Sequence, residues 1–151
     1  MEIIKIDDEL LASLHSQAVT SERKRVNFDL RTSSEDNSQR MLNVLVPGTD
    51  VPIHRHKKSN ESVVCLSGKL VEIFYEEVFP LIDFPKGMDA QDFPSGKRLR
   101  EVARYVLDPT VGNYGCVVPV GVWHRVEVLE PSVIFEAKDG RYGEDGSEFY
   151  K

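Results

Sequence analysis

The chain has 151 residues, with 19 lysines and arginines against 25 aspartates and glutamates, a formal net charge of −6 and 40% hydrophobic residues. A chain of this length buries enough surface to fold as one domain without disulfide bonds. The negative balance argues against nucleic acid and anionic membranes as partners, because both need a positive protein surface. The composition excludes disordered, fibrous and membrane-spanning classes.

The N-terminus does not resemble an export signal. It has no basic region followed by an apolar run and a small-residue cleavage site. The two cysteines, Cys65 and Cys116, each lie inside an apolar segment typical of a strand. We therefore expect a cytoplasmic protein in which both thiols are reduced, buried and used only for packing.

The chain begins with one predicted helix, over residues 7–18. Asp7 can cap it, and Leu10, Leu11, Leu14 and Ala18 share one face. His15 lies in this helix, and we interpret it as a surface or packing residue. We expect a single domain overall, in which residues 1–30 form a helix and arm that pack on residues 31–151.

From residue 40 onward the pattern is that of short β-strands. The predicted strands are Met41–Val46, Ser62–Leu66, Leu70–Tyr75, Val102–Leu107, Tyr114–Val118, Val122–Leu129 and Val133–Ala137. Turn residues separate them, including Ser67-Gly68 and Glu130-Pro131. Many short strands with almost no helix favour an antiparallel sandwich or barrel. Residues 80–97 break the rhythm with prolines and glycines, so we expect a surface insertion there.

Three of the four histidines lie in the β-rich part, together with one suitably placed carboxylate. His54 and His56 are two residues apart, so both rings project to the same face of an extended chain. Glu61 follows after a polar stretch that can turn, and His124 begins a later predicted strand. Three imidazoles and a carboxylate suit one divalent transition metal such as Zn, Fe, Mn, Ni or Co.

The spacing of these residues carries a family resemblance. Gly48, five residues, His54-Arg55-His56, four residues, Glu61, six residues and Gly68 match the first signature motif of the cupins. A second cupin motif corresponds to Pro119-Val120-Gly121-Val122-Trp123-His124. Within the cupins, the chain is most similar to the WbuC-like metalloproteins associated with bacterial O-antigen and surface polysaccharide. Two departures, one extra residue between Gly112 and Pro119 and Val128 where many cupins have asparagine, touch no ligand.

The resemblance implies an all-β fold: a cupin barrel, that is, a double-stranded β-helix or jelly roll, preceded by a short N-terminal helix. It implies His54, His56, Glu61 and His124 as the metal ligands. Trp123 is interpreted as a packing residue beside the site.

Other polar residues are weaker candidates for binding a substrate. Arg40 and Asn43, at or next to the predicted strand that leads into Gly48, and Lys138, directly after the last predicted strand, can project into the barrel. Tyr75 and Lys57 can line its mouth. Lys138 and Tyr75 are also candidate acid–base groups, because Glu61 would be used as a ligand; metal-bound water is the alternative. Cys65 shares the strand parity of Glu61, and we favour a packing thiol there.

Three functional hypotheses remain open on the sequence alone. The first is a metal-dependent isomerase or epimerase acting on a small polar sugar or nucleotide-sugar metabolite of bacterial surface polysaccharide synthesis. The second is an Fe(II) dioxygenase of the cupin type, and the third is a non-catalytic ligand-binding or regulatory module. We also expect a homodimer, the commonest closed assembly.

Overall fold

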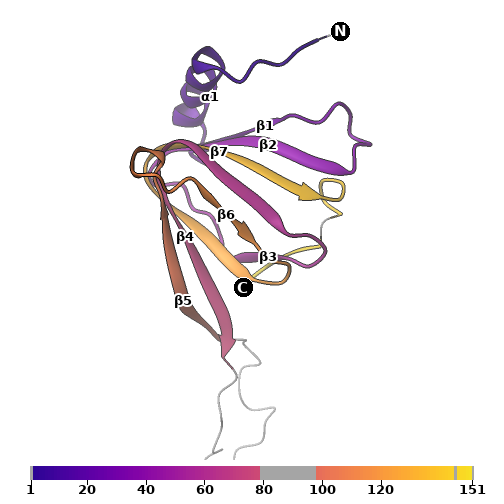
Figure 1. The fold of residues 1–151 in the computed structure, drawn as a ribbon, viewed down its shortest axis with the longest axis vertical. Coiled ribbons are helices and arrows are strands. Elements are labelled where there is room, and N and C mark those ends of the chain that lie inside the picture. The colour runs from indigo at the N-terminus through magenta and orange to yellow at the C-terminus, as the bar shows by residue number, and fades with distance from the viewer. Residues whose placement is uncertain (1, 79–97, 145, 151) are drawn as a thin grey trace, which may run out of the picture.

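The computed structural model describes residues 2–78, 98–144 and 146–150. Along the chain these residues form α1 (Asp8–Thr20), β1 (Arg25–Asp29), β2 (Ser38–Leu45), β3 (His54–His56), β4 (Glu61–Val78), β5 (Arg98–Leu107), η2 (Pro109–Val111), β6 (Gly115–Val118), β7 (Trp123–Asp139) and β8 (Ser147–Phe149). The insertion expected over residues 80–97 lies outside the described residues. Figure 1 shows the strands as one strongly curled sheet.

The helix follows the sequence prediction closely. It begins after Asp7, whose carboxylate accepts a hydrogen bond from the backbone N–H of Leu10 at 3.1 Å. Leu14 and Ala18 are buried against Leu42 and Val44 of β2, so the helix covers the outer face of the sheet (Figure 1). His15 is exposed, as expected for a surface residue.

Every strand pair is antiparallel, and the two longest strands organise the sheet. β7 pairs with β2, β3 and β4, while β4 also pairs with β5 and β6. β1 adds to the outer side of β2, and β8 adds to β3. This arrangement brings β3, far away in sequence, next to the start of β7.

The prediction of turns at Ser67-Gly68 and at Glu130-Pro131 was wrong. β4 and β7 each run through these residues as one continuous bent strand, and the β4–β7 register shifts three times between Cys65 and Leu70. Gly68 has φ +93°, a conformation that favours glycine, and its backbone lies close against Pro131. Both residues therefore mark a β-bulge, where an extra residue bends a strand without ending it.

Three short strands were not predicted. β1 and β8 are mostly polar, and β3 spans three residues, so none of them carries a hydrophobic run of its own. They are strands because their backbone groups are paired: β1 pairs with β2, and β3 pairs with both β7 and β8.

The closed end of the curled sheet holds the main core. It contains Leu45, Val63, Cys65, Leu70, Leu107, Val126, Val128 and Ile134. Cys65 is buried there as a packing thiol, and burial raises its pKa to about 11. Cys116 is only half-buried, so the expectation of two buried thiols holds for one of them; both are free.

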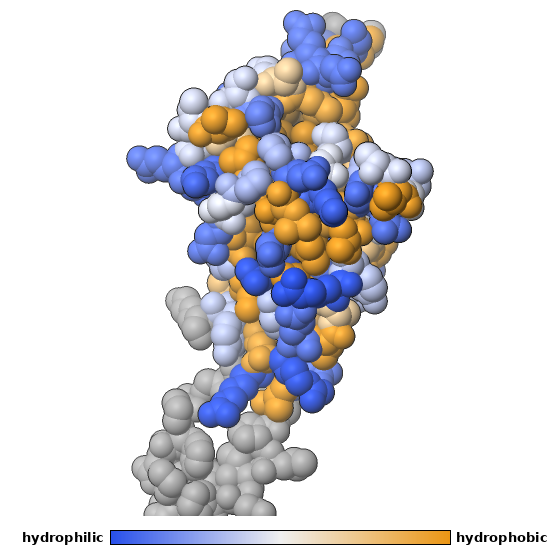
Figure 2. All heavy atoms as spheres, turned by 90° about the vertical axis from the view of Figure 1, so that its left-hand side faces the viewer, coloured by the Kyte–Doolittle hydropathy of each residue, from blue (hydrophilic) through white to orange (hydrophobic). Residues whose placement is uncertain are grey.

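The outer face of β5 and β6 carries exposed apolar side chains. Val102 and Val106 of β5 and Val117 of β6 are each at least 40% exposed. Figure 2 shows apolar atoms gathered in the middle of one face, between charged side chains. No helix among the described residues is long and apolar enough to cross a bilayer.

Candidate metal centre

Three imidazoles meet inside the curled sheet. His54 on β3 stands directly opposite His124 on β7, and their ring centroids are 4.3 Å apart. The His56 ring is 5.1 Å from that of His54 and 5.5 Å from that of His124. One ring nitrogen from each histidine lies within 4.8 Å of the other two. The spacing of two residues along β3 therefore turns both rings toward the same partner strand.

Glu61, the first residue of β4, lies beside these rings. Its Oε2 is 2.8 Å from Nε2 of His56, and its Oε1 is 3.7 Å from Nε2 of His124. Burial by itself would raise the pKa of Glu61, but the neighbouring His124 and His56 rings lower it below its usual range. The structure thus gathers the four side chains predicted as ligands, and their binding of a metal remains a prediction.

Backbone carbonyls orient two of the rings. Nδ1 of His54 lies 2.9 Å from the carbonyl oxygen of Pro52, and Nδ1 of His124 lies 2.9 Å from that of Val122. A carbonyl oxygen only accepts, so in each ring Nδ1 carries the proton and donates it. Nε2 is then the lone-pair nitrogen, which is the atom a metal needs. Nε2 of His124 is buried, lies 3.7 Å from Oε1 of Glu61 and makes no hydrogen bond within the described residues, which leaves its lone pair available for a metal.

The third ring is held by the C-terminal strand. Nδ1 of His56 is 2.9 Å from Oγ of Ser147 on β8. Two ion pairs attach β8 in turn, since Glu148 binds Arg55 at 2.7 Å and Lys57 at 2.8 Å. These two cations lower the pKa of Glu148 to about 2. The sequence analysis did not identify Ser147, because no local pattern connects it to His56.

The His54 ring favours its neutral form. Burial and the neighbouring His124 lower the pKa of His54 to about 4. A neutral imidazole is the form that binds a transition metal. The environment of the ring therefore agrees with the ligand role predicted for it.

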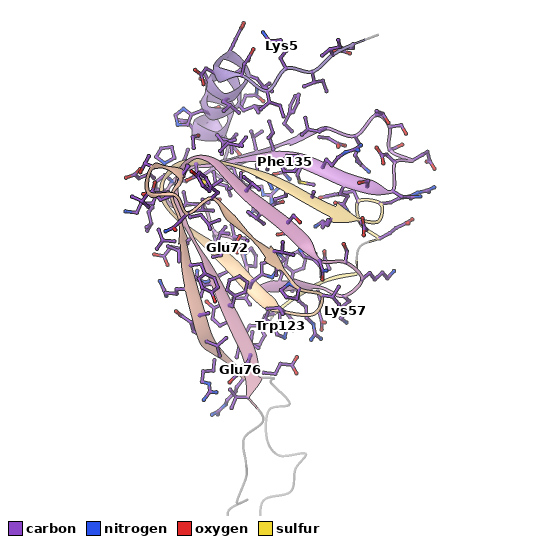
Figure 3. All side chains as sticks on the ribbon, in the orientation of Figure 1. Lys5, Lys57, Glu72, Glu76, Trp123 and Phe135 are labelled. Carbon is purple, nitrogen blue, oxygen red and sulfur yellow. The ribbon has the colours of Figure 1, made fainter. Side chains whose placement is uncertain are left out.

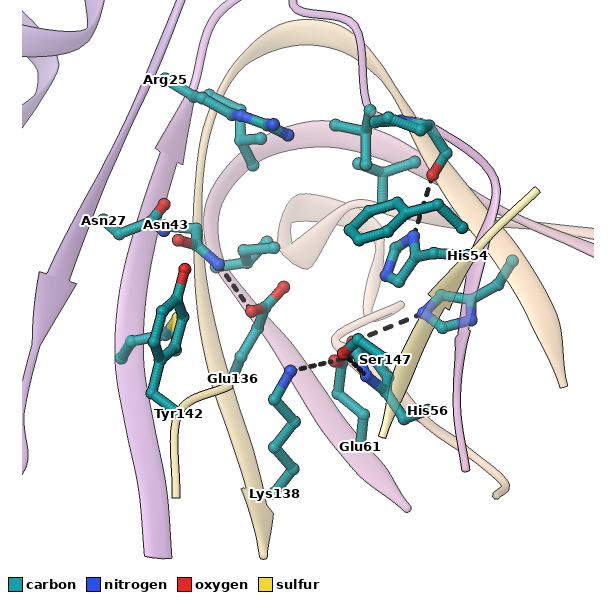
Figure 4. A pocket seen from close by; sticks show the side chains of 18 of the residues that line it. Arg25, Asn27, Asn43, His54, His56, Glu61, Glu136, Lys138, Tyr142 and Ser147 are labelled. Carbon is teal, nitrogen blue, oxygen red and sulfur yellow. Dashed lines mark hydrogen bonds and ion pairs between the residues drawn. The ribbon is translucent and has the colours of Figure 1, made fainter. Parts of the chain in front are cut away.

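The histidines open into a cavity of about 470 Å³. Figure 4 shows His54, His56 and Glu61 on one side of it and Asn27, Asn43, Glu136 and Tyr142 on the other. Arg25, Lys138 and Ser147 also line it. The volume is that of a pocket for a small molecule.

Two of the predicted substrate residues line this cavity. Lys138 is nearly buried, and its Nζ is 3.7 Å from Oε2 of Glu61. Asn43 is buried, and its Nδ2 donates a hydrogen bond of 2.6 Å to Oε2 of Glu136. Their roles in binding remain predictions.

The other three predicted residues do not line the cavity. Arg40 pairs with Asp36 on the outside, because it is three residues from Asn43 and strand parity turns it to the opposite face. The hydroxyl of Tyr75 accepts a hydrogen bond from Nε of Arg125 at 2.9 Å. Lys57 is exposed and pairs with Glu148, at the end of the sheet that also holds Trp123 (Figure 3).

Trp123 is a packing residue of the barrel wall. It is 3% exposed, and its Nε1 donates a hydrogen bond of 3.0 Å to Oε1 of Glu77. The Arg55 guanidinium lies over its ring, 4.4 Å from the centroid. Through these contacts with Glu77 and Arg55, the indole fixes the start of the strand that carries His124.

Two carboxyl groups that line the cavity were missed by the sequence analysis. Glu72 of β4 is 1% exposed and lines the cavity (Figure 3), and burial raises its pKa well above the usual value. Burial and the charge of Glu61 raise the pKa of Glu136 to about 8. Strand parity could have indicated Glu136. It lies two residues from Lys138, which was predicted to project into the barrel, so both side chains lie on the same face of the strand.

Comparison with known proteins supports the fold. A family profile described as a domain of unknown function, DUF6016, matches residues 6–80. No curated protein matches the chain. Among solved structures, CapF from Staphylococcus aureus, called a capsular polysaccharide assembling protein, superposes with a TM-score of 0.58 at 18% identity. Oxalate oxidase in complex with the substrate analogue glycolate superposes with a TM-score of 0.57 at 16% identity.

Both neighbours are cupin-fold proteins. The chain has the cupin fold. The superposition on CapF covers 87% of this chain and 33% of CapF, and that on oxalate oxidase covers 95% of this chain and 64% of the enzyme. The chain therefore spans about one third of CapF, and identities this low support the fold alone.

Proposed function

We propose that this cupin is a WbuC-like metal-dependent enzyme that isomerises or epimerises a small sugar or nucleotide-sugar metabolite of bacterial surface polysaccharide synthesis. The metal would be one divalent transition ion, held by His54, His56, His124 and Glu61. The observation that carries the proposal is the convergence of three ring nitrogens within 4.8 Å. Backbone carbonyls hold two of these rings with Nε2 available for a metal.

The four predicted ligands fit an ion that does Lewis-acid chemistry. When bound, such an ion polarises a substrate oxygen or makes a bound water more acidic. Glu61 would be occupied as a ligand, so another group must hold or move the proton. Lys138 is the better placed of the two predicted acid–base candidates, because its Nζ lies in the cavity beside Glu61 while Tyr75 does not line it.

The substrate class is supported by three kinds of observation. The cavity of about 470 Å³ accommodates a monosaccharide-sized group. Its walls are rich in amide, carboxyl and basic side chains, which bind hydroxyl groups. CapF, a protein named for capsular polysaccharide assembly, shares the fold.

We place the protein in the cytoplasm. We expect a homodimer that forms through the apolar outer face of β5 and β6.

The direct test is metal analysis of freshly purified protein together with zinc titration. Wild-type protein is expected to bind one divalent ion, and His124→Ala is expected to lose most of that affinity. His15→Ala is the matched control, because His15 is the one histidine outside the site and is exposed. Equal zinc affinity in His124→Ala and wild type would overturn the metal centre.

Activity separates the enzymatic hypotheses. Turnover of a nucleotide-sugar panel is expected to stop with a chelator and to return with one added metal. Turnover that instead needs oxygen and iron would show the dioxygenase. A ligand that co-purifies unchanged, with no turnover on the panel, would show a binding module.

A further inference from the structure

The cavity wall carries two buried polar atoms without a hydrogen bond among the described residues, one on β2 across from the histidines and one on β4 beside the strand of His124. Asn43 is 8% exposed, and its Oδ1 has no partner among the described residues. Glu72 is 1% exposed, and its Oε2 likewise has none within the described part of the chain. Both residues line the cavity. A buried polar atom without a partner destabilises a protein, so such atoms usually serve a ligand or an ordered water.

Glu136 extends this wall. One of its oxygens accepts the hydrogen bond from Nδ2 of Asn43, which orients the Asn43 amide so that Oδ1 remains available as an acceptor. Figure 4 shows the other Glu136 oxygen directed into the cavity, between Asn43 and the histidine side. Burial raises the pKa of Glu136 to about 8, so at neutral pH this carboxyl favours its neutral form, which both donates and accepts.

Groups that donate and accept at short spacing are complementary to hydroxyl groups. A ligand hydroxyl can donate to Oδ1 of Asn43 and can interact with a carboxyl of Glu136 or Glu72. An anionic ligand group gains no charge pairing at this wall, because its groups are an amide and carboxyls rather than cations. The inner part of the ligand should therefore be uncharged and hydroxylated.

The rim of the cavity has the opposite character. Arg23 is exposed and Arg25 is half-buried, and both line the cavity. Burial and the charge of Arg23 lower the pKa of Arg25. Two guanidinium groups on the lining of one cavity attract a phosphate, which can bind both.

We propose that Asn43, Glu136 and Glu72 form a hydroxyl-binding subsite, and that Arg23 and Arg25 bind the phosphate of the same ligand. The ligand class is a sugar carrying a phosphoryl group, with its ring between the wall and the histidines. The inference rests on the proposed function, because it assumes that the cavity holds the substrate. Sugar 1-phosphates and nucleoside-diphosphate sugars share this chemistry.

The test is calorimetric titration of zinc-loaded protein. The probes are the 1-phosphates of glucose, galactose, mannose and N-acetylglucosamine, their nucleoside-diphosphate esters, and inorganic phosphate. At least one sugar ester is expected to bind more tightly than phosphate alone. A tighter 1-phosphate identifies the free sugar phosphate as the ligand, and a tighter nucleoside-diphosphate ester identifies the nucleotide sugar.

Single variants then test the hydroxyl-binding residues and the phosphate-binding arginines separately. Asn43→Ala is expected to weaken binding of the best probe about tenfold or more, because it removes the amide oxygen that accepts from a ligand hydroxyl. Gln39→Ala is the matched control: Gln39 is also a buried amide of β2 but does not line the cavity. Glu136→Leu should weaken the probe more than Glu136→Gln, which keeps a donor and an acceptor. Arg25→Met should weaken the phosphate esters while leaving unchanged the binding of an added neutral probe, the methyl glycoside of the same sugar, which has no phosphate.

Zinc affinity is measured in the same samples, so that failure of this subsite and failure of the metal centre are distinguishable. Wild-type zinc affinity with no binding of any sugar ester would overturn the subsite and leave the metal centre standing. So would a best probe that binds Asn43→Ala and Glu136→Leu as tightly as wild type. Absence of zinc binding in wild type would instead overturn the proposed function.

Discussion

Oγ of Ser147 lies 2.9 Å from Nδ1 of His56, although 91 positions separate the two residues in the chain. The contact links the last strand to a predicted metal ligand. A hydrogen bond on Nδ1 fixes the orientation of a ring and makes Nε2 a better metal ligand. The C-terminal strand is therefore part of the candidate metal centre.

Removal of this contact should weaken the metal site without unfolding the protein. We expect Ser147→Ala to reduce zinc affinity by roughly 10- to 100-fold, the usual effect of losing a hydrogen bond to a ligating histidine. Competition titration with a fluorescent chelator measures the affinity. Ser16→Ala, on the exposed side of α1, is the control and should bind zinc like wild type. An unchanged affinity in Ser147→Ala would show that β8 does not support the site.

The bulge at Gly68 should be intolerant of a side chain. A Cβ there would lie 2.2 Å from the carbonyl oxygen of Pro131, and φ is already +93°. We expect Gly68→Ala to lower the free energy of unfolding by about 3–5 kcal/mol. The backbone at Pro131 must shift to admit the Cβ, and alanine is strained at this positive φ. Gly112→Ala is the matched control: φ is +83° but nothing lies within 4 Å, so about 1–2 kcal/mol is expected. Urea denaturation measures both, and equal losses would contradict the bulge.

Glu136 should make the metal-free protein less stable at alkaline pH. The pKa of this carboxyl is raised from 4.5 to about 8, so the folded protein holds a proton that the unfolded chain releases. The stability contribution is complete below about pH 4.5 and is lost as pH rises through about 8. Glu136→Gln should show a shallower loss over this range, though not none, because burial raises the pKa of Glu72 in the same direction. Denaturation curves with a chelator present test this, and identical slopes would refute it.

The stabilisation by zinc should disappear in acid. Protons compete with a metal for ring nitrogens, and His54, whose pKa is lowered to about 4, keeps its neutral form to lower pH than an ordinary histidine. We expect the difference in Tm with and without zinc to persist at pH 6 and to shrink toward pH 4. His15→Ala should behave like wild type at every pH. A difference that stays constant down to pH 4 would mean that the histidines are not the ligands.

The fold class, the helix and the four predicted ligands were all accessible from local patterns. Asp7 followed by leucines at helical spacing predicts where α1 begins, and α1 begins there. The spacing of His54, His56 and Glu61 matches the cupin motif, and the cupin fold is present. These features depend on residues close in sequence, or on a motif whose members the fold brings together.

What the sequence alone could not reveal depends on pairing between distant strands. The turn expected at Gly68 is a bulge, because β4 stays paired with β7 on both sides of it. Asn43 faces the cavity and Arg40 does not, because the neighbouring strands and the helix determine which face of β2 points inward.

The amino-acid sequence by itself determined the chemistry present: three imidazoles and a carboxylate at spacings that suit one metal. The tertiary structure alone decided the groups around them, because Ser147, Glu136 and Glu72 come near the histidines only when β4, β7 and β8 pair. The physical reason is that a strand's side chains alternate between two faces, and only the pairing of the whole sheet decides which face is enclosed.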